Sequence, residues 1–422
     1  MKVYKFGGAS VKDAGGIRNL CAIVKGNAQE TLIVVVSAIG KTTNRLEEVV
    51  KAWFQGKSDA RYIVEKLKDA HFEIYRDLFP DGNENLEKVL QEEFNTLSKM
   101  LDTPPTEDFD KLYDSIVSIG EIWSTQLVHA YCAEEGVNGK WMDARKIIKT
   151  DTIFRNANVD LRATSQECQT ILSSTLKTSQ VIFVQGFIGA NDNGNVTTLG
   201  REGSDYSAAI FAYCTNAESV TIWKDVPGVL NADPKWFSST QKIESLTYQD
   251  AIELSYYGAT VIHPKTIKPL QNKKIPLYVK SFLHAGEAGT VIGEVNRHLP
   301  IPSFIFKVNQ VLITLSPRDF SFIGEENLSH IFAGFHSYGL PANVMQLSAI
   351  SFSICTDWQE EKIRKLISDF NHKYKVLYNQ DVELVTIRYY DQATIDRVCL
   401  QKQVLLEQKS RYTVQLVVRN GS

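Results

Sequence analysis

Residues 1–10 read MKVYKFGGAS, in which a short strand-like segment, Val3–Phe6, leads into two glycines. The next pattern, over Lys12–Lys25, has the periodicity of a helix. A continuous apolar run, Thr31–Val36 (TLIVVV), predicts a second strand, which ends at Ser37. Strand, glycine turn, helix and strand in this order indicate two parallel strands joined by a helical connection.

The alternation of strand and helix patterns continues to about residue 295. Gln180–Gln185 and Val220–Trp223 are further short apolar runs, and residues 44–134 are mostly helical in pattern. Continuous apolar strands separated by helices are typical of a mostly parallel sheet that helices cover on both faces. We therefore expect a single α/β domain over residues 1–297.

The carboxyl-terminal part of the sequence has a different pattern. Asn296–Ser303 contains two prolines and no periodicity, which predicts a linker. Residues 304–380 then show strand and helix patterns in the order βαββαβ, which predicts a ferredoxin-like domain. Residues 381–422 begin a similar unit, with a helix expected over Asp391–Gln408, but they are too few to complete it. We therefore expect a truncated second unit.

The composition excludes several classes of function. The 422 residues are 43% apolar and 23% charged with a formal net charge of -3, so no global basic field attracts nucleic acid or an anionic membrane. No apolar run approaches the ~20 residues that span a bilayer, and the first residues lack the features of a secretory signal. We expect a cytoplasmic protein with no nucleic-acid or membrane partner.

Six cysteines are scattered along the sequence without a C-x-x-C pair. This spacing is typical neither of a disulfide framework nor of a zinc site, and the histidines also lack metal-like spacing. We expect buried free thiols in a reducing compartment and no metal-binding residue cluster.

The first candidate for a binding site follows the first predicted strand. Lys5 lies at the end of that strand, Gly7 and Gly8 follow the strand, and a helix comes next. The glycines let backbone N–H groups approach an anion, and the helix N-terminus and the lysine both attract negative charge, so these are the parts of a phosphate site. The sequence has no G-x-x-x-x-G-K-[ST] motif, so such a site is not a P-loop. A glycine turn with a solvated lysine is the alternative.

The second candidate is the segment TTLGREGSDYS at residues 197–207. Arg201 offers two parallel hydrogen bonds to a carboxylate, and Gly203 and Ser204 open a helix whose N-terminus favours an anion. Asp205 can orient a catalytic lysine or hold magnesium. The alternative is structural: Ser204 caps the helix, Asp205 favours the helix dipole in its first turn, and Arg201 forms a surface ion pair.

Further candidates lie at other strand ends and in a helix. Polar residues follow the second strand over residues 37–44, glycines flank an aromatic residue at 186–189, and a double turn at 223–234 can wrap an adenosine. Plain turns are the alternative at each of these positions. Glu121 follows Gly120 inside a helical stretch, where a glycine is locally unfavourable and hints at a close approach. The alternative for Glu121 is a solvated helix face.

Taken in order, these motifs resemble the aspartokinase branch of the amino-acid kinase family. The resemblance implies transfer of the ATP γ-phosphoryl group to the β-carboxylate of L-aspartate, giving 4-phospho-L-aspartate, the first step of lysine, threonine and methionine biosynthesis. It implies ATP as co-substrate with Mg²⁺. The motifs that carry it are KFGGAS (5–10), VSA (36–38), SIGE (118–121), WMDAR (141–145), GFIG (186–189), TLGREGSD (198–205), DVPGVLNADP (225–234) and ELSYYGATVIHP (253–264).

The resemblance also implies roles for individual positions. Lys5 would neutralise the transferring phosphate, Arg201 would hold the substrate α-carboxylate, and Glu121 would hold its ammonium group. The implied catalytic residues are Lys5, Gly8 and Asp205. The implied substrate-binding residues are Thr43, Glu121, Phe187, Arg201, Gly203 and Ser204. The implied ATP-binding residues are Lys5, Phe6, Gly7, Gly8, Ser10, Lys224, Asp225, Leu230, Asp233 and Thr260.

The predicted βαββαβ region resembles the ACT domains of aspartokinases, which bind feedback-inhibiting amino acids. The resemblance therefore implies a homodimer formed through the ACT region. Some positions depart from the family pattern: Glu202 stands where glycine is common, Lys224 where threonine is common, Leu230 where tyrosine is common, and Thr260 where lysine is common. These departures keep a second hypothesis open, a non-catalytic amino-acid-sensing or regulatory paralogue on the same fold.

Overall fold

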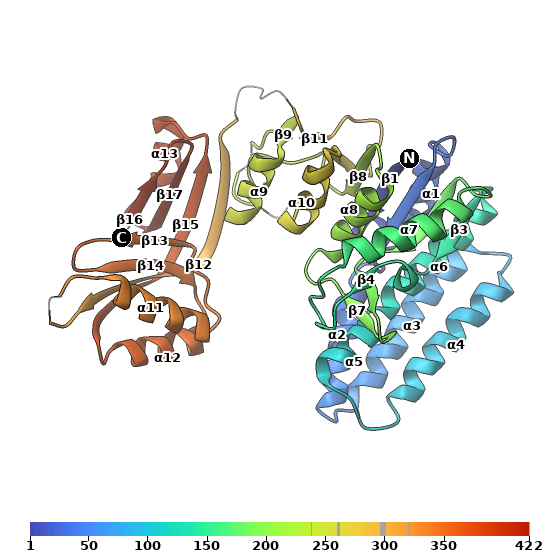
Figure 1. Cartoon of the computed structure of the whole chain (residues 1–422), viewed down its shortest axis with the longest axis horizontal. Helices are drawn as coiled ribbons and strands as arrows, with labels where there is room; N and C mark the ends of the chain where they lie inside the picture. The colour runs from blue at the N-terminus through green and yellow to red at the C-terminus, as the bar shows by residue number, and fades with distance from the viewer. Residues whose placement is uncertain (238, 260–261, 296–300, 320, 422) are drawn as a thin grey trace. The chain divides into compact units, whose positions relative to one another are not determined.

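The structure, a computed structural model, describes residues 1–237, 239–259, 262–295, 301–319 and 321–421. The described residues divide into two units (Figure 1). Each unit has its own hydrophobic core. The first unit takes in Met1–Val229, Glu244–Ile252 and the described part of Val261–Asn296. The second takes in the described parts of Leu230–Ile243, Glu253–Thr260 and Arg297–Ser422. Two short segments before residue 297 therefore pack with the carboxyl-terminal unit.

The first unit alternates strands and helices along most of its length. Its elements are β1 (Lys2–Phe6), the 3₁₀ turn η1 (Gly8–Val11), α1 (Ala14–Lys25), β2 (Leu32–Val36), α2 (Thr42–Phe54), α3 (Asp59–Leu78), α4 (Glu84–Met100), α5 (Phe109–Val117), α6 (Ile119–Glu134), β3 (Gly139–Met142), η2 (Ala144–Lys146), β4 (Lys149–Thr150), α7 (Leu161–Thr175), β5 (Val181–Gln185), β6 (Ile188–Asn191), β7 (Val196–Thr198), α8 (Gly203–Thr215), β8 (Ser219–Lys224), β9 (Ser245–Thr247), α9 (Tyr248–Tyr257), α10 (Pro264–Lys273), β10 (Leu277–Ser281) and β11 (Thr290–Gly293). The division between the units falls inside α9.

The main sheet of the first unit has the strand order β3-β5-β2-β1-β8-β10-β11-β9. All neighbouring pairs are parallel except β10 with β11. The predicted mostly parallel sheet is thus confirmed. β2 and β5 are buried along their whole length, which explains why their sequences are continuous apolar runs instead of alternating ones.

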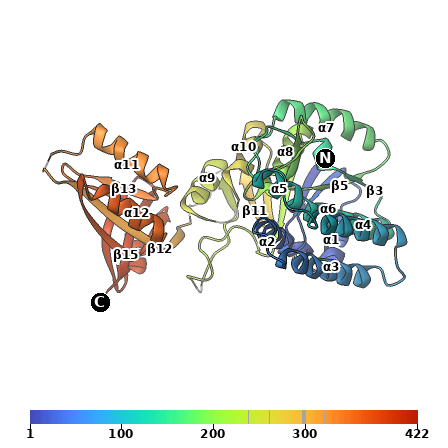
Figure 2. The ribbon, with the colours of Figure 1, turned by 90° about the horizontal axis from the view of Figure 1, so that it is seen from below.

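Helices cover both faces of this sheet (Figure 2). Tyr4 and Phe6 of β1 belong to the core that includes side chains of α1, α3, α4 and α6. Successive side chains of a strand point to opposite faces, so Lys5, between them, lies on the other face. That face is the one covered by α8, as the ion pair between Lys5 and the first turn of α8 confirms. The N-terminal strand therefore delivers a lysine to the start of α8.

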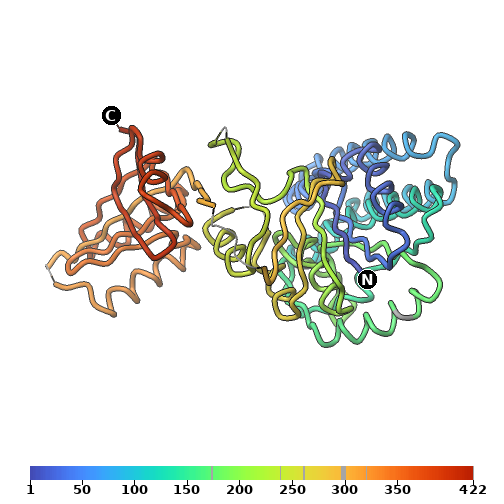
Figure 3. Tube along the Cα trace, turned by 90° about the horizontal axis from the view of Figure 1, so that it is seen from above, coloured from blue at the N-terminus to red at the C-terminus, as the bar shows by residue number. Residues whose placement is uncertain are grey.

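The second unit is built on an antiparallel sheet with the order β13-β14-β12-β15-β17-β16. The chain trace in Figure 3 ends in this unit. Its elements are β12 (Ser303–Pro317), α11 (Glu325–Ser337), β13 (Val344–Leu347), β14 (Phe352–Asp357), α12 (Glu360–Phe370), β15 (Tyr374–Arg388), α13 (Gln392–Cys399), β16 (Lys402–Lys409) and β17 (Thr413–Asn420). The order β12-α11-β13-β14-α12-β15 is the predicted βαββαβ pattern.

The two longest strands, β12 and β15, pair with each other along most of their length. The pairing is interrupted between Lys307 and Leu312, close to two residues with left-handed backbone, Asn309 (φ 55°) on β12 and Asp381 (φ 54°) on β15. The predicted division between residues 380 and 381 falls at this irregularity, inside a single strand. The two halves of the sheet are therefore continuous through β12 and β15.

One predicted helix is wrong. The helix expected over Asp391–Gln408 ends at Cys399, and Lys402–Lys409 forms strand β16, which pairs with β17. Gln401, with φ 58°, lies between the two elements. Of the predicted linker Asn296–Ser303, residues 296–300 lie outside the described part, and Ser303 already begins β12. No helix among the described residues is long and apolar enough to cross a membrane.

Candidate active site

A cavity of ≈ 880 Å³ lies in the first unit, where β1, β2, β5 and β8 reach their carboxyl ends. β1 has β2 as its neighbour on one side and β8 on the other, so the strand order changes direction at β1. Open α/β sheets bind ligands at such a switch point. The cavity brings together many residues that the sequence predicted for catalysis and binding. They are Lys5, Gly8, Thr43, Glu121, Phe187, Arg201, Gly203, Ser204, Asp205 and Lys224.

Two lysines and one aspartate form the charged centre of the cavity. Lys5 Nζ lies 2.6 Å from Asp205 Oδ1, and Lys224 Nζ lies 3.7 Å from Asp205 Oδ2. Lys5 and Asp205 are only 8% and 3% exposed. Burial raises the pKa of the Asp205 carboxyl, whereas the positive charges of Lys5 and Lys224 lower it. The lysines have the larger combined effect, so the pKa lies below its usual value. The aspartate is therefore ionised and holds both ammonium groups in place.

Gly8 allows the loop after β1 to contact the loop after β2. A Cβ at Gly8 would lie 2.7 Å from Gly40 O and 2.8 Å from Ala38 O, which is closer than real Cβ contacts. The two loops are also joined by a hydrogen bond from Gly40 N to Gly8 O. The predicted glycine is thus required by backbone packing at the cavity wall.

Glu121 lines the same cavity from the first turn of α6, where it is buried and 2% exposed. Burial raises the pKa of its carboxyl to about 8, although the charge of Lys5 and a hydrogen bond to the Ala38 backbone oppose the shift. Its Oε2 has no hydrogen-bond partner among the described residues. The carboxyl is therefore in a place where a cationic group of a ligand would replace a proton.

Gly120 has a structural explanation. A Cβ there would lie 2.8 Å from Thr42 Cγ2 and 3.1 Å from Leu46 Cδ1, so α2 approaches α6 closely at this point. A hydrogen bond from Ser124 Oγ to Ser37 O, 2.7 Å long, joins α6 to the loop after β2. The close approach that the glycine indicated is thus helix packing, which positions Glu121 beside the cavity.

Two non-glycine residues with left-handed backbone lie near each other, one between β5 and β6 and the other at the N-cap of α8. Phe187 has φ 71° and Glu202 has φ 53°. A Cβ at Gly203 would lie 2.6 Å from Phe187 Cδ2, and Phe187 N donates to Ser207 Oγ. The residue at the N-cap is Glu202, not Ser204, and it makes no side-chain cap. The alternative in which Ser204 caps the helix is therefore wrong.

The cavity also contains a charged wall that the sequence did not predict. Glu47 comes from α2, Asp110 and Tyr113 come from α5, and Arg155 comes from the loop between β4 and α7. These residues come from three segments that are far apart in the sequence and belong to no short motif, so local patterns carried no signal for them. Arg201, which was predicted, is exposed and forms no ion pair with any described residue.

The structure places several predicted ATP-binding residues away from the cavity lining. Phe6 is buried in the core and stacks on Trp223 at 5.9 Å between ring centroids. Ser10 is also buried, with its Oγ 3.5 Å from Trp223 O. Gly7 and Asp225 are not among the residues that line the cavity. Any contact of Phe6 with a nucleotide would therefore involve its backbone.

The three remaining residues that were predicted to bind the nucleotide lie in the second unit or outside the described residues. Leu230 and Asp233 belong to the second unit, where Leu230 pairs with Lys242 and Asp233 Oδ1 accepts a hydrogen bond from Lys235 N. Thr260 lies outside the described residues. Their predicted role stays a prediction.

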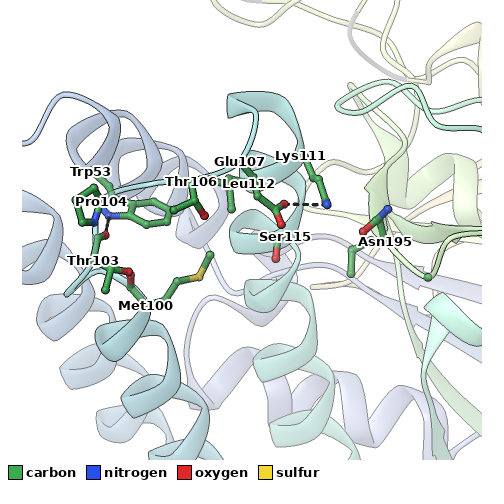
Figure 4. A pocket seen from close by; sticks show the side chains of 12 residues that line it. Trp53, Met100, Thr103, Pro104, Thr106, Glu107, Lys111, Leu112, Ser115 and Asn195 are labelled. Atoms are coloured by element: carbon green, nitrogen blue, oxygen red, sulfur yellow. Dashed lines mark hydrogen bonds and ion pairs between the residues drawn. The ribbon is translucent and has the colours of Figure 1, made fainter.

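A second cavity, of ≈ 360 Å³, is lined in part by α5 (Figure 4). Trp53 and Met100 form part of its wall, and the ion pair of Lys111 with Glu107, 2.9 Å long, lies at another part. α5 thus contributes side chains to two cavities. Asp110 and Tyr113 of this helix line the larger cavity, whereas Lys111, Leu112 and Ser115 line the smaller one.

Comparison with known proteins agrees with this geometry. Residues 1–281 match the model of the amino acid kinase family. Lysine-sensitive aspartokinase 3 of Escherichia coli (strain K12) is 31% identical over 358 residues, which cover 84% of this chain and 78% of the relative. The chain belongs to the amino acid kinase family, in its aspartokinase branch.

Solved aspartokinases share the fold over almost the whole chain. A crystal structure of E. coli aspartokinase III in complex with lysine and aspartate (T-state) superposes with a TM-score of 0.83 at 25% identity, covering 99% of this chain and 96% of that one. The structure of the same enzyme in complex with aspartate and ADP (R-state) gives a TM-score of 0.81 at 26% identity, with the same coverage. The aspartokinase fold predicted from the motifs is thus confirmed.

Proposed function

We propose that the larger cavity binds L-aspartate and ATP and transfers the γ-phosphoryl group to the β-carboxylate, giving 4-phospho-L-aspartate and ADP. One observation carries the proposal: a single cavity contains a lysine pair held by Asp205 and, separately, the buried carboxyl of Glu121. The first suits a phosphoryl group and the second suits an ammonium group. The E. coli relative solved in complex with aspartate and ADP supports the same pair of ligands.

Lys5 and Lys224 compensate negative charge on the phosphoryl group. In phosphoryl transfer the protein contributes mainly positioning and charge compensation, because negative charge spreads over the transferring oxygens. Asp205 holds the two ammonium groups before the substrates arrive, so no reorganisation is needed during the reaction. Mg²⁺ accompanying the nucleotide would be held largely by the phosphates, with Asp205 as the ionised carboxylate on this side of the cavity, and it would neutralise phosphate charge.

The amino-acid side of the cavity provides complementary groups for aspartate. We infer that the exposed guanidinium of Arg201 binds the α-carboxylate and that Glu121 binds the ammonium group, with Thr43 and Phe187 completing the wall. Glu121 must lose its proton to make this ion pair, and the positive charge of the ligand favours that loss. The β-carboxylate then faces the lysine side.

The direct test is ATP- and Mg²⁺-dependent formation of aspartyl hydroxamate by the full chain in the presence of hydroxylamine. We expect product with L-aspartate and none with L-glutamate, and Arg201→Ala should raise the KM for L-aspartate far more than the KM for ATP. A folded chain that binds L-aspartate in calorimetry but forms no hydroxamate would instead support the amino-acid-sensing alternative.

We further propose that the chain forms a homodimer through its second unit, which would act as an ACT-like regulatory region. β13 is at the edge of the antiparallel sheet, and Met345 and Leu347 on it are 40% and 52% exposed. Ile350, just after it, is 49% exposed. An apolar edge strand favours pairing with another strand. Light scattering of the wild type and of Leu347→Lys tests this, since the substitution should yield monomers and an unchanged mass would contradict it.

A cytoplasmic location also belongs to this proposal. The six cysteines are free thiols, and all but Cys399 are buried. Free thiols persist in a reducing compartment. This supports the cytoplasm as the place of action.

A further inference from the structure

Arg155 has an unusual backbone for its residue type. It lies in the loop between β4 and α7 with φ 64°, in the left-handed region. A residue with a Cβ pays roughly 1–2 kcal/mol for this conformation, whereas glycine pays little. Backbone strain of this kind concentrates at functional sites, where the surrounding structure holds it in place. An arginine at this position therefore indicates that its side chain has a function that glycine could not provide.

The strained backbone is held by one buried carboxylate. Asp114 Oδ2 accepts hydrogen bonds from Arg155 N (2.9 Å) and from Thr198 N (2.9 Å), and Asp114 Oδ1 accepts from Thr198 Oγ1 (2.6 Å). Asp114 is completely buried. The loop that carries Arg155 is thus tied both to α5 and to β7, the strand that leads to Arg201.

The guanidinium of Arg155 is held in place by two neighbours but still has N–H donors available for a ligand. Its Nη1 donates to Asp110 Oδ1 at 3.1 Å, and its Cζ lies 4.5 Å from the ring centroid of Tyr113. This single hydrogen bond uses one of the five N–H donors that a guanidinium offers. The side chains of the ion pair are 44% and 50% exposed, so further donors remain accessible. All three side chains line the larger cavity.

Arg155 lies next to the segment that presents Arg201. Ala157 N donates to Thr198 O, and a Cβ on Gly200 would lie 3.4 Å from Arg155 O. Arg155 and Arg201 therefore belong to adjacent segments of one cavity wall. That wall includes Phe187, whose O accepts a hydrogen bond from Leu199 N.

From this geometry we propose that Arg155 is a substrate-binding residue that shares the α-carboxylate of L-aspartate with Arg201. The inference rests on the proposed function, because it names a second residue for one group of the proposed substrate. Two guanidinium groups on one carboxylate favour a substrate with a free α-carboxylate over amides and esters. Asp110 and Tyr113 act through Arg155 as positioning residues.

The test is Arg155→Gly, chosen because glycine accepts the backbone conformation without cost. We expect an unchanged or slightly higher thermal midpoint, and a KM for L-aspartate raised roughly tenfold to a hundredfold, as for loss of a charge-assisted hydrogen bond. kcat and the KM for ATP should stay within about threefold of wild type. The matched control is Arg162→Ala, which removes an exposed guanidinium from the nearby start of α7 and should change none of these values.

A second measurement identifies the group that Arg155 contacts. The α-amide of L-aspartate keeps the ammonium group and the β-carboxylate but lacks the charged α-carboxylate. Its inhibition constant against L-aspartate should be the same for Arg155→Gly and wild type. An unchanged KM for L-aspartate, or an equal loss of affinity for the amide, would overturn the assignment. Failure of the wild type to form hydroxamate would instead contradict the proposed function, and calorimetric titration of L-aspartate would still test Arg155.

Discussion

Asp205 and Glu121 are buried carboxyls in the same cavity, and Lys5 acts on both, yet their pKa values shift in opposite directions. Asp205 lies 2.6 Å from Lys5 and also faces Lys224, so its pKa is lowered despite its burial. Glu121 has no lysine in direct contact among the described residues, so burial dominates and its pKa rises to about 8. The distance to the ammonium group thus divides the cavity into an ionised side and a side that holds a proton.

The difference gives each side a separate task. The ionised side is ready for phosphate before any ligand binds, because Asp205 already fixes the lysines. The protonated side becomes charged only when a cationic group of the substrate arrives to replace the proton. Binding of the amino acid is therefore coupled to proton release, whereas binding of the nucleotide is not coupled in this way.

The largest effect is expected from removing the shared lysine. Lys5→Met should lower kcat for hydroxamate formation by roughly 10³-fold, because a preorganised charge at the transferring phosphoryl group is lost. Lys2→Met is the matched control on the same strand, since Lys2 pairs with Glu30 at 2.7 Å outside the cavity. Near-normal activity of Lys5→Met would contradict a catalytic role for the lysine pair held by Asp205.

A smaller and more diagnostic effect is expected from pH. Below its pKa of about 8, Glu121 must release a proton to bind the substrate ammonium, so the KM for L-aspartate should fall as pH rises from 6 towards 8. The slope should approach about tenfold per pH unit. Glu121→Gln should raise this KM and abolish its slope, measured by initial rates across the range. A slope that persists in the variant would assign the proton to another group.

The same pKa shift has a consequence for stability. Because burial raises the pKa of Glu121 above its unfolded value, the folded chain holds a proton that the unfolded chain has released between about pH 4.5 and 8. The free energy of unfolding should therefore fall as pH rises through this window. Denaturant unfolding of Glu121→Gln should lack that contribution, so its stability relative to wild type should increase towards pH 8.

The smallest effect is expected from Ser10, and it tests how far the ionised side extends. The side chain is buried, its Oγ is 3.5 Å from Trp223 O, and its N–H already donates to Gly7 O. Ser10→Ala should therefore change the KM for ATP by less than about threefold. A change above tenfold would extend the phosphate-binding wall to η1, in agreement with the role that the family resemblance implies.

Strand ends were the part of the site that the sequence could predict. Lys5 lies near the end of β1, and Gly8 and Phe187 follow buried strands. The carboxyl ends of parallel strands meet at one edge, so the proximity of these residues followed from the strand assignment. Arg155 and Asp110 could not be found in this way. They are 45 residues apart, on a loop and a helix, and only the fold of α5 against β7 brings them together.

The error at the carboxyl terminus has a different physical origin. Residues 402–409 read KQVLLEQK, whose lysine, glutamine, leucine and glutamate are good helix formers. Most of these side chains are exposed in β16, with Leu406 buried, so apolar periodicity was weak evidence for either structure. Pairing with β17 decides the conformation. Intrinsic propensity was overridden by a contact that local sequence does not contain.

The continuity of β12 and β15 limits how the second unit can be exchanged between genes. β14 pairs with residues 310–315 of β12, whereas β17 pairs with residues 383–388 of β15. Residues 303–307 of β12 also pair with residues 384–388 of β15, and residues 312–317 of β12 pair with residues 374–379 of β15. A recombination event at residue 380 would cut β15 in two. Each product would then hold only one part of β15 and would lose the pairing that the other part makes. The two halves therefore form one continuous sheet, and a graft that respects this continuity must keep residues 303–421 together.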